Sequence, residues 1–241
     1  MQDLEEASIN NQFIKTYVEN VKHTEESRKA NAREKITYND IIDEILSNRL
    51  HYRAARKLTD YQLEAIAQKL LTEKKISNRE KLLSVFGKTK YPFDSQFILE
   101  LAKNKRKSKI KELAIAALQF LNSDAIREFA LETINESKNP GTMVRILKSN
   151  YETGDDKMLT DLVKKFRNED VIESLAISYI DIYKSNITKE CKEPLEAVYD
   201  KLTCAIHRKD LVEILIENQV ISDKIKDEIK FDCDDEIRQL L

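Results

Sequence analysis

The sequence DSQFILELAKNKRKSKIKELAIAALQFL, residues 94–121, holds two apolar stripes separated by a basic, polar segment. In the first stripe Phe97, Ile98 and Leu101 follow one another at helical spacing. The second stripe uses the same steps of three and four residues: Ile110, Leu113, Ala114, Ala117, Leu118 and Leu121. Such steps place apolar side chains on one face of an α-helix. The stretch therefore predicts two short helices joined by a basic turn.

This two-helix pattern recurs three more times downstream. The first helix of each pair is expected to start near Ser95, Asp124, Asp156 and Glu193, at spacings of 29, 32 and 37 residues. Every proline and glycine falls at a proposed boundary: Gly87, Pro92, Pro140, Gly141, Gly154 and Pro194. A single pair cannot bury its own apolar stripes, so neighbouring pairs must stack. The sequence predicts an all-α fold, a right-handed α-solenoid of stacked antiparallel helix pairs.

Two segments resemble a known family. The sequence IKELAIAALQFLNSDAIREFALETI, residues 110–134, is similar to short HEAT repeats of the kind found in phycobilin-lyase-like HEAT proteins. The tail, residues 195–240, resembles the end of stand-alone bacterial HEAT-repeat proteins. The resemblance implies a HEAT-like, armadillo-type superhelix. It also implies a scaffold that mediates protein–protein interaction, because HEAT arrays mostly bind partners.

Composition narrows the class of protein. Of 241 residues, 41% are hydrophobic and 35% are charged, and only 3 Gly and 3 Pro are present, which disfavours a turn-rich β-fold. Three cysteines are too few for a disulfide framework. The N-terminus is acidic and polar, and no apolar run approaches the length of about 20 residues that a membrane span needs. We expect a soluble, cytoplasmic protein that does not contact a membrane.

The upstream part of the chain is expected to cover one end of the stack. Residues 1–37 are predicted to form an N-terminal helical extension or cap, with a helix from Phe13 to Lys22, and residues 38–241 to form the solenoid. Residues 38–58 carry one helical stripe. Thr59 or Asp60 is expected to cap the next helix, whose stripe runs to Leu71. Ser77 with Glu80 predicts a capping box, and Gly87 ends that helix.

Charge is distributed unevenly along the chain. Residues 49–111 contain 17 Lys and Arg against 6 Asp and Glu, a net charge of +11. Residues 122–241 contain 18 against 26, a net charge of −8. The basic half predicts an acidic partner, which is either nucleic acid or an acidic protein. The predicted binding residues are Arg49, Arg53, Arg56, Lys88, Lys90, Lys103, Lys105, Arg106 and Lys107.

Simpler interpretations of the basic half stay open. A lysine-rich turn is most often only a solvated surface. Tyr91 and Phe93 lie close by and could stack on bases, although burial between helices is the commoner role. HEAT-like alkylpurine DNA glycosylases show that this fold can host an enzyme, but those enzymes depend on Trp, and this chain has none.

The cysteines, histidines and acidic pairs are the remaining candidates for metal binding or catalysis. Cys204 and His207 have the two-residue gap of a zinc-binding pair, and Cys191 and Cys233 would complete four ligands if the fold brought them together. The acidic pair at residues 155–156 is better explained as a helix N-cap. The histidines show no spacing typical of a catalytic base, and no glycine-rich phosphate loop is present. We therefore predict no catalytic residue, metal or cofactor.

The sequence thus predicts a non-enzymatic scaffold that binds a protein partner along one face of the stack. The alternative is a nucleic-acid-binding protein that uses the basic segment 49–111, or more distantly a DNA-glycosylase-like enzyme.

Overall fold

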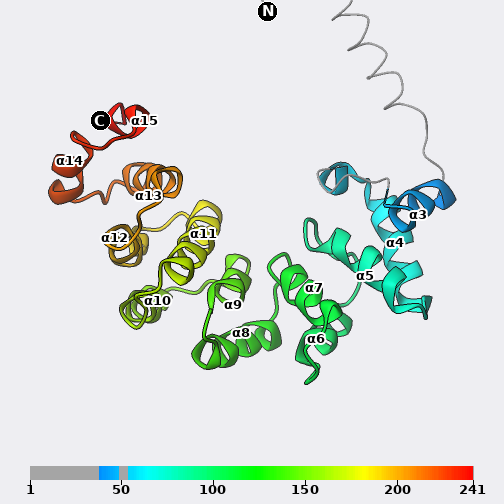
Figure 1. Ribbon diagram of the computed structural model, residues 1–241. Coiled ribbons are helices and arrows are strands. Elements are labelled where there is room, and N and C mark those ends of the chain that lie inside the picture. Colours follow the sequence, from blue (N-terminus) through cyan, green and yellow to red (C-terminus); the bar gives the residue numbers. More distant parts are fainter. Residues whose placement is uncertain (1–37, 49–53, 241) are drawn as a thin grey trace, which may run out of the picture. The chain divides into compact units, whose positions relative to one another are not determined.

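The computed structural model describes residues 38–48 and 54–240 of the chain. The predicted extension over residues 1–37, with its helix from Phe13 to Lys22, lies outside these residues, as do Arg49 and Arg53. All secondary structure within the described residues is helical, and none of it is a strand (Figure 1). The all-α prediction is confirmed.

The helices are short, and three of them are 3₁₀-helical turns, labelled η. The elements of the first half are α3 (Tyr38–Leu46), η1 (Ala54–Lys57), α4 (Asp60–Thr72), α5 (Ile76–Phe86), α6 (Gln96–Lys103), α7 (Lys109–Leu118) and α8 (Asp124–Glu136). The elements of the second half are α9 (Gly141–Val144), η2 (Arg145–Lys148), α10 (Asp155–Lys164), α11 (Glu169–Ser185), η3 (Lys189–Cys191), α12 (Lys192–Tyr199), α13 (Ala205–Glu217), α14 (Asp223–Ile229) and α15 (Asp235–Arg238).

The chain divides into two compact units, Met1–Asp43 and Glu44–Leu241. Of the first unit, the structure describes only residues 38–43, which begin α3. The contacts, pocket and side-chain clusters discussed below all belong to the second unit.

Helices of the second unit pack mainly against their neighbours and next neighbours in the chain. Examples are α6 with α7, α5 with α7, α9 with α11, α10 with α12 and α11 with α13 (Figure 1). The predicted stripes supply fully buried side chains to these contacts, among them Ile98, Leu118, Leu159, Leu175, Leu195 and Leu215. Elements that are one or two apart in the chain therefore bury their apolar stripes against each other.

Two asparagine side chains connect successive turns. Asn150, which is buried, donates from Nδ2 to Ile146 O of its own turn at 2.9 Å and to Leu121 O at 2.8 Å. Asn186 repeats this arrangement, donating to Ile182 O and to Lys148 O, both at 2.9 Å. Each amide therefore ties the end of one helix to the end of an earlier one.

The predicted helix starts are confirmed to within one residue. The first helices of the four pairs begin at Gln96, Asp124, Asp155 and Lys192. Thr59 caps α4, and its hydroxyl and the Gln62 side chain form a capping box. Gly87 is the C-cap of α5, as predicted.

Four local predictions are wrong. The stripe over residues 38–58 is not one helix, because α3 ends at Leu46 and Asn48 is left-handed, with φ 58°. Ser77 and Glu80 form no capping box, since α5 begins at Ile76 and Lys75 holds the N-cap position without a side-chain hydrogen bond. The preceding turn is fixed instead by Glu73, whose carboxylate accepts from the amides of the next two residues.

The other two wrong predictions concern single residues. Leu71, placed in the buried stripe of α4, is 45% exposed. The N-cap of α10 is Gly154, in the left-handed region with φ 97°, rather than an aspartate. Asp155 is instead the first residue of the helix, where its carboxylate accepts a hydrogen bond from the Glu152 amide.

Candidate functional site

The basic turn between α6 and α7 is built by polar side chains that leave the cations exposed. Asn104 Oδ1 accepts from the Arg106 amide at 3.0 Å, and Ser108 Oγ caps α7 by accepting from the Lys111 amide at 3.2 Å. The Lys111 ammonium donates back to Asn104 O at 2.8 Å. Four predicted binding residues extend from this turn into solvent: Lys103, Lys105, Arg106 and Lys107.

Three more predicted residues, Lys88, Lys90 and Arg56, are described and lie on other segments. Lys88 and Lys90 are exposed in the segment that precedes α6, so the length of α6, about 12 Å for an eight-residue helix, separates them from the turn that follows it. Arg56 is exposed on η1. The predicted cations that the structure describes therefore lie on three segments of this half of the unit: η1, the segment before α6 and the turn after α6.

These exposed cations have no carboxylate partner in the described part of the chain. Among the described residues of the first half, Lys69 pairs with Glu73 and Lys109 pairs with Glu112. In the acidic half some ion pairs lie within one helix, as Lys164–Asp161 does, and others join different elements: Arg145–Asp181, Lys184–Asp210, Lys224–Asp200 and Lys209–Glu236. The positive charge of the first half is thus left available to a binding partner.

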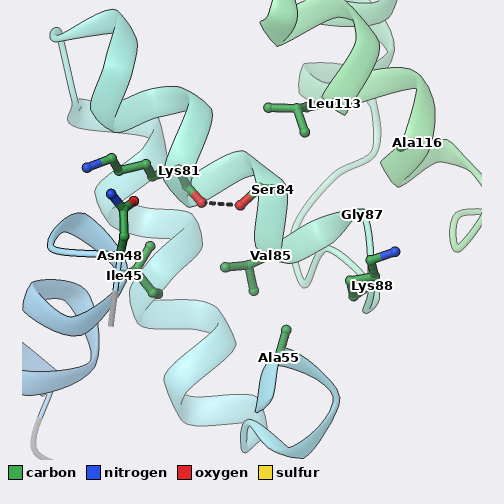
Figure 2. Close-up of a pocket in the computed structure, with 10 residues that line it drawn as sticks. All are labelled: Ile45, Asn48, Ala55, Lys81, Ser84, Val85, Gly87, Lys88, Leu113 and Ala116. Atoms are coloured by element: carbon green, nitrogen blue, oxygen red, sulfur yellow. Dashed lines mark hydrogen bonds between the residues drawn. The ribbon is translucent and has the colours of Figure 1, made fainter. Parts of the chain in front are cut away.

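An apolar pocket of about 350 Å³ lies between the end of α3, η1, α5 and α7 (Figure 2). Its apolar lining comes from Ile45, Ala55, Val85, Leu113 and Ala116, and its polar lining from Asn48, Lys81, Ser84 and Lys88. A pocket of this size accepts one large side chain or a small apolar ligand.

Among the described residues, two of the polar side chains around this pocket already form hydrogen bonds within the protein, and Lys88 does not. Lys81 Nζ donates to Leu46 O at 2.6 Å and so closes the end of α3, while Ser84 Oγ donates to Lys81 O at 2.6 Å (Figure 2). The exposed ammonium of Lys88 has no hydrogen-bond or ion-pair partner in the described residues. The pocket thus places an available cation beside an apolar surface.

Tyr91 is buried between helices and is not exposed for stacking on a base. It is 1% exposed, and its ring packs edge-to-face on Phe86 at a centroid distance of 4.9 Å. A base cannot stack on a ring that is enclosed by protein. Phe93 packs edge-to-face on Tyr91 at 5.8 Å and keeps 38% of its surface exposed.

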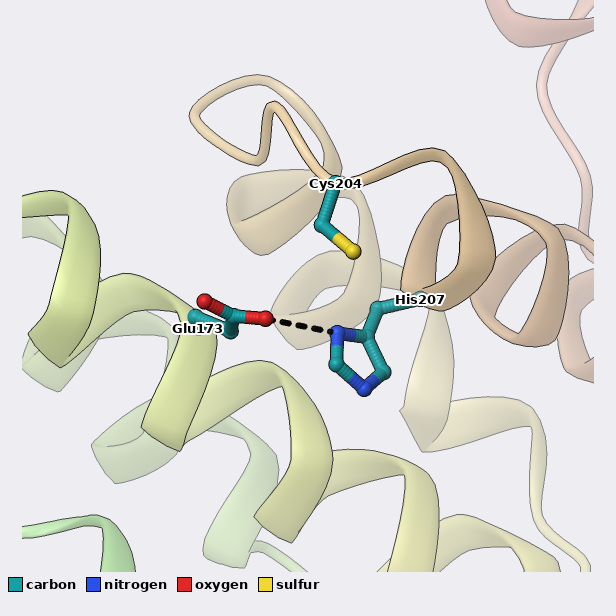
Figure 3. Close-up of side chains that lie close together, drawn as sticks. All are labelled: Glu173, Cys204 and His207. Carbon is teal, nitrogen blue, oxygen red and sulfur yellow. Dashed lines mark ion pairs between the residues drawn. The ribbon is translucent and has the colours of Figure 1, made fainter. Parts of the chain in front are cut away.

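The four candidate zinc ligands do not come together. Cys204 and His207 lie close to Glu173, with one ligand atom of each residue within 4.8 Å of the others (Figure 3). Cys191 is buried in η3, and this burial raises the pKa of its thiol to about 11. Cys233 is exposed near the C-terminus. Neither belongs to the metal-compatible group found in the described residues.

Sequence reasoning missed Glu173, because no local motif links it to a cysteine 31 residues later. The repeat period was the available signal, because residues about one period apart in a repeat protein lie on elements that pack together, and α11 does contact α13. The sequence analysis also missed the pocket, because its lining residues come from four elements and no spacing along the sequence connects them.

Comparisons with protein-family models, with curated proteins and with solved structures find no match to this chain. Within the described residues, every helix falls short of the combination of length and apolar content that crossing a bilayer demands. The HEAT resemblance stays a prediction drawn from the residues.

Proposed function

We propose that this chain is a non-enzymatic HEAT-like scaffold that binds an acidic protein segment at its basic half. The segment would insert an apolar side chain into the pocket between α5 and α7 and place carboxylates against Lys88 and the exposed cations nearby. The main support for this proposal is the pocket, which is apolar inside and is flanked by Lys88, a cation without a partner among the described residues.

An α-solenoid is the architecture we propose for this scaffold. Its support is the contact pattern, in which helices pack on neighbours and next neighbours in the chain. The ion pairs agree with this pattern, since Lys184–Asp210 joins α11 to α13 and Lys224–Asp200 joins α12 to α14. A stack of helix pairs brings together elements that are one repeat apart.

The chemistry of the pocket favours a peptide over a small polar metabolite. Its lining is mainly aliphatic, and its described polar side chains are two lysines, a serine and an asparagine. One lysine and the serine are already engaged in hydrogen bonds to backbone carbonyls. An anchor side chain in an apolar pocket with a charged rim is the usual arrangement of a peptide-binding surface.

The test is a peptide-display selection against the full-length chain. We expect enrichment of sequences that carry one large apolar residue flanked by Asp or Glu. Binding of a selected, fluorescently labelled peptide should weaken at least tenfold in Lys88→Glu and in Ala116→Phe, which fills the pocket. Lys157→Glu reverses an exposed lysine on α10 and should leave affinity unchanged. Selected peptides without acidic residues, or equal loss in all three variants, would overturn the proposal.

Nucleic acid is the second candidate, and the exposed turn with Lys103, Lys105, Arg106 and Lys107 favours it. Cations that neutralise phosphates release counterions, so affinity for DNA or RNA falls steeply with salt. We would titrate the chain with mixed single-stranded DNA and RNA at increasing salt. A steep slope that flattens in Lys105→Glu/Arg106→Glu/Lys107→Glu supports this candidate, and no binding at low salt removes it.

A further inference from the structure

A cluster of three metal-ligating side chains lies away from the basic half, where α11 meets α13. Glu173 belongs to α11, Cys204 is the N-cap residue of α13, and His207 lies in the first turn of α13. Figure 3 shows the carboxylate of Glu173 reaching toward the imidazole of His207, with the thiol of Cys204 beside them. The three ligand atoms lie within 4.8 Å of one another.

Local structure and packing both contribute to this arrangement. Residues three apart at the start of a helix project to the same side, which brings the Cys204 thiol and the His207 imidazole together. Helices α11 and α13 pack against each other, which adds the Glu173 carboxylate from the facing helix. The cluster therefore exists only where two successive helix pairs meet.

The distances are close to those of a zinc site. Zinc binds sulfur at about 2.3 Å and nitrogen or oxygen at about 2.0–2.2 Å, so ligands at a tetrahedral angle lie about 3.3–3.6 Å apart. Nδ1 of His207 lies 3.3 Å from Oε1 of Glu173. The 4.8 Å limit on the other separations is about 1 Å above this range, a difference that side-chain rotation covers.

One unsatisfied atom points to a ligand. Nδ1 of His207 is buried and makes no hydrogen bond of acceptable geometry, even though the Glu173 carboxylate is close. A buried polar atom without a hydrogen bond is costly, and a metal ion coordinated by Nδ1 would remove that cost. The second observation is the donor set itself, because a thiolate, an imidazole and a carboxylate together suit zinc far better than magnesium or calcium.

From this geometry we infer that the chain binds one zinc ion through Cys204 Sγ, His207 Nδ1 and Glu173. Three protein ligands leave the fourth tetrahedral position to water or to an incoming group. The side chain of Glu173 is 46% exposed and that of His207 is 22% exposed, so solvent reaches this position. Bound zinc links α11 to α13 and adds stability to the junction between two helix pairs.

The test uses the tag-free, full-length chain, reduced and stripped of metal by a chelator. Zinc chloride is titrated by calorimetry, and bound zinc is measured by elemental analysis after gel filtration. Cobalt(II) replaces zinc in a parallel titration, because a cobalt–thiolate bond gives a near-ultraviolet charge-transfer band. We expect one zinc per chain, a rise in Tm, and that band in the cobalt form.

Variants identify the ligands. Cys204→Ser and His207→Gln should each weaken zinc binding at least tenfold, Cys204→Ser should also abolish the charge-transfer band, and Glu173→Gln should weaken binding. Cys233→Ser removes an exposed thiol outside the cluster and should bind zinc like the wild type. Circular dichroism checks that each variant keeps its helical content.

Two results would overturn the inference. One is the absence of stoichiometric zinc in the wild-type chain, which needs no variant and would leave a His207–Glu173 ion pair only. The other is wild-type affinity in a folded Cys204→Ser variant. Neither result bears on peptide binding at the basic half, so the two proposals fail separately.

Discussion

Arg127 on α8 and Asp155 on α10 form a bidentate ion pair, with Nη–Oδ distances of 2.7 and 2.8 Å. The side chains are 16% and 9% exposed, so water screens the pair weakly. Hydrogen bonding to Asp155 raises the pKa of the Arg127 guanidinium. The same guanidinium donates to Asn150 O at 2.7 Å and thereby connects the pair to the turn before α10.

We expect Asp155→Asn to lower the free energy of unfolding by about 2 kcal/mol, because it removes the more buried of the two carboxylates that face the Arg127 guanidinium and leaves only the exposed Glu152. The asparagine side chain would also lose part of the hydrogen bonding, because the Asp155 carboxylate accepts from the Glu152 backbone amide as well as from Arg127. Chemical denaturation at neutral pH measures the change. The control is Asp161→Asn, which breaks an exposed pair with Lys164 and should leave stability nearly unchanged. Equal effects of the two substitutions would contradict this account.

The asparagine links predict an order of stability losses. Asn150→Ala removes two amide donors and the Oδ1 acceptor of the Ser123 amide, so we expect a loss of about 2–3 kcal/mol. Asn186→Ala removes two donors at a half-buried position and should cost about 1 kcal/mol. Denaturation midpoints at constant m-value give both numbers.

Asn218 is the matched comparison, because its amide donates to Ile214 O of its own helix and forms no hydrogen bond to an earlier turn within the described residues. If links between turns matter, Asn218→Ala should cost less than Asn150→Ala, although both residues are buried. A larger loss for Asn218→Ala would show that burial, not the link, decides the effect.

Features that depend on near neighbours in sequence were predictable, and features that depend on packing were not. Thr59 marks a helix start because a cap uses amides only two or three residues away. The Ser77 box failed because α5 begins at Ile76, so Ser77 lies inside the helix and not at its N-cap. The turn that Glu73 forms just before α5 is not visible in a pattern of residue types.

The candidate sites show the same division. The exposed basic turn follows from a run of lysines between two stripes, and the structure places those residues in solvent. The pocket needs four elements to meet, and Ala55 and Ala116 line it only because of how η1 and α7 lie. Glu173 joins Cys204 and His207 across a helix–helix contact, so only the repeat period could have suggested it.

Gly141, the first residue of α9, has no space for a side chain. A Cβ atom there would lie 2.0 Å from Ser174 Oγ and 2.8 Å from Ser174 O, both on α11. We expect Gly141→Ala to destabilise the chain by about 2 kcal/mol or more, because backbone of a packed helix has to shift. Thermal and chemical denaturation provide the measurement.

Two further variants separate the causes of that loss. Gly87→Ala places its Cβ no closer than 3.4 Å to Ser84 O, at a right-handed position, and should be tolerated. Adding Ser174→Ala to Gly141→Ala removes the hydroxyl clash but leaves the carbonyl clash, so only part of the stability should return. Full recovery would show that the backbone of α11 is not the obstacle.

Glu73 has a strongly lowered pKa, from 4.5 to about 2. The main cause is the Lys75 amide, which donates to Oε1 at 2.9 Å, and Asn78 and Lys69 add smaller contributions. Because the folded state favours the ionised carboxylate, Glu73 contributes stability above pH 4.5 and loses it as pH falls toward 2. The stability difference between wild type and Glu73→Gln should therefore shrink across that window.

NMR titration of the Glu73 carboxyl carbon checks the pKa directly, with an expected midpoint near pH 2. Lys69→Met tests the cause, since it removes the ion pair at 3.3 Å and keeps the backbone hydrogen bonds. Because those hydrogen bonds are the larger effect, the midpoint in Lys69→Met should stay well below 4.5. A return to 4.5 in that variant would assign the shift to the lysine, and would mean that the turn between α4 and α5 is held by charge rather than by backbone amides.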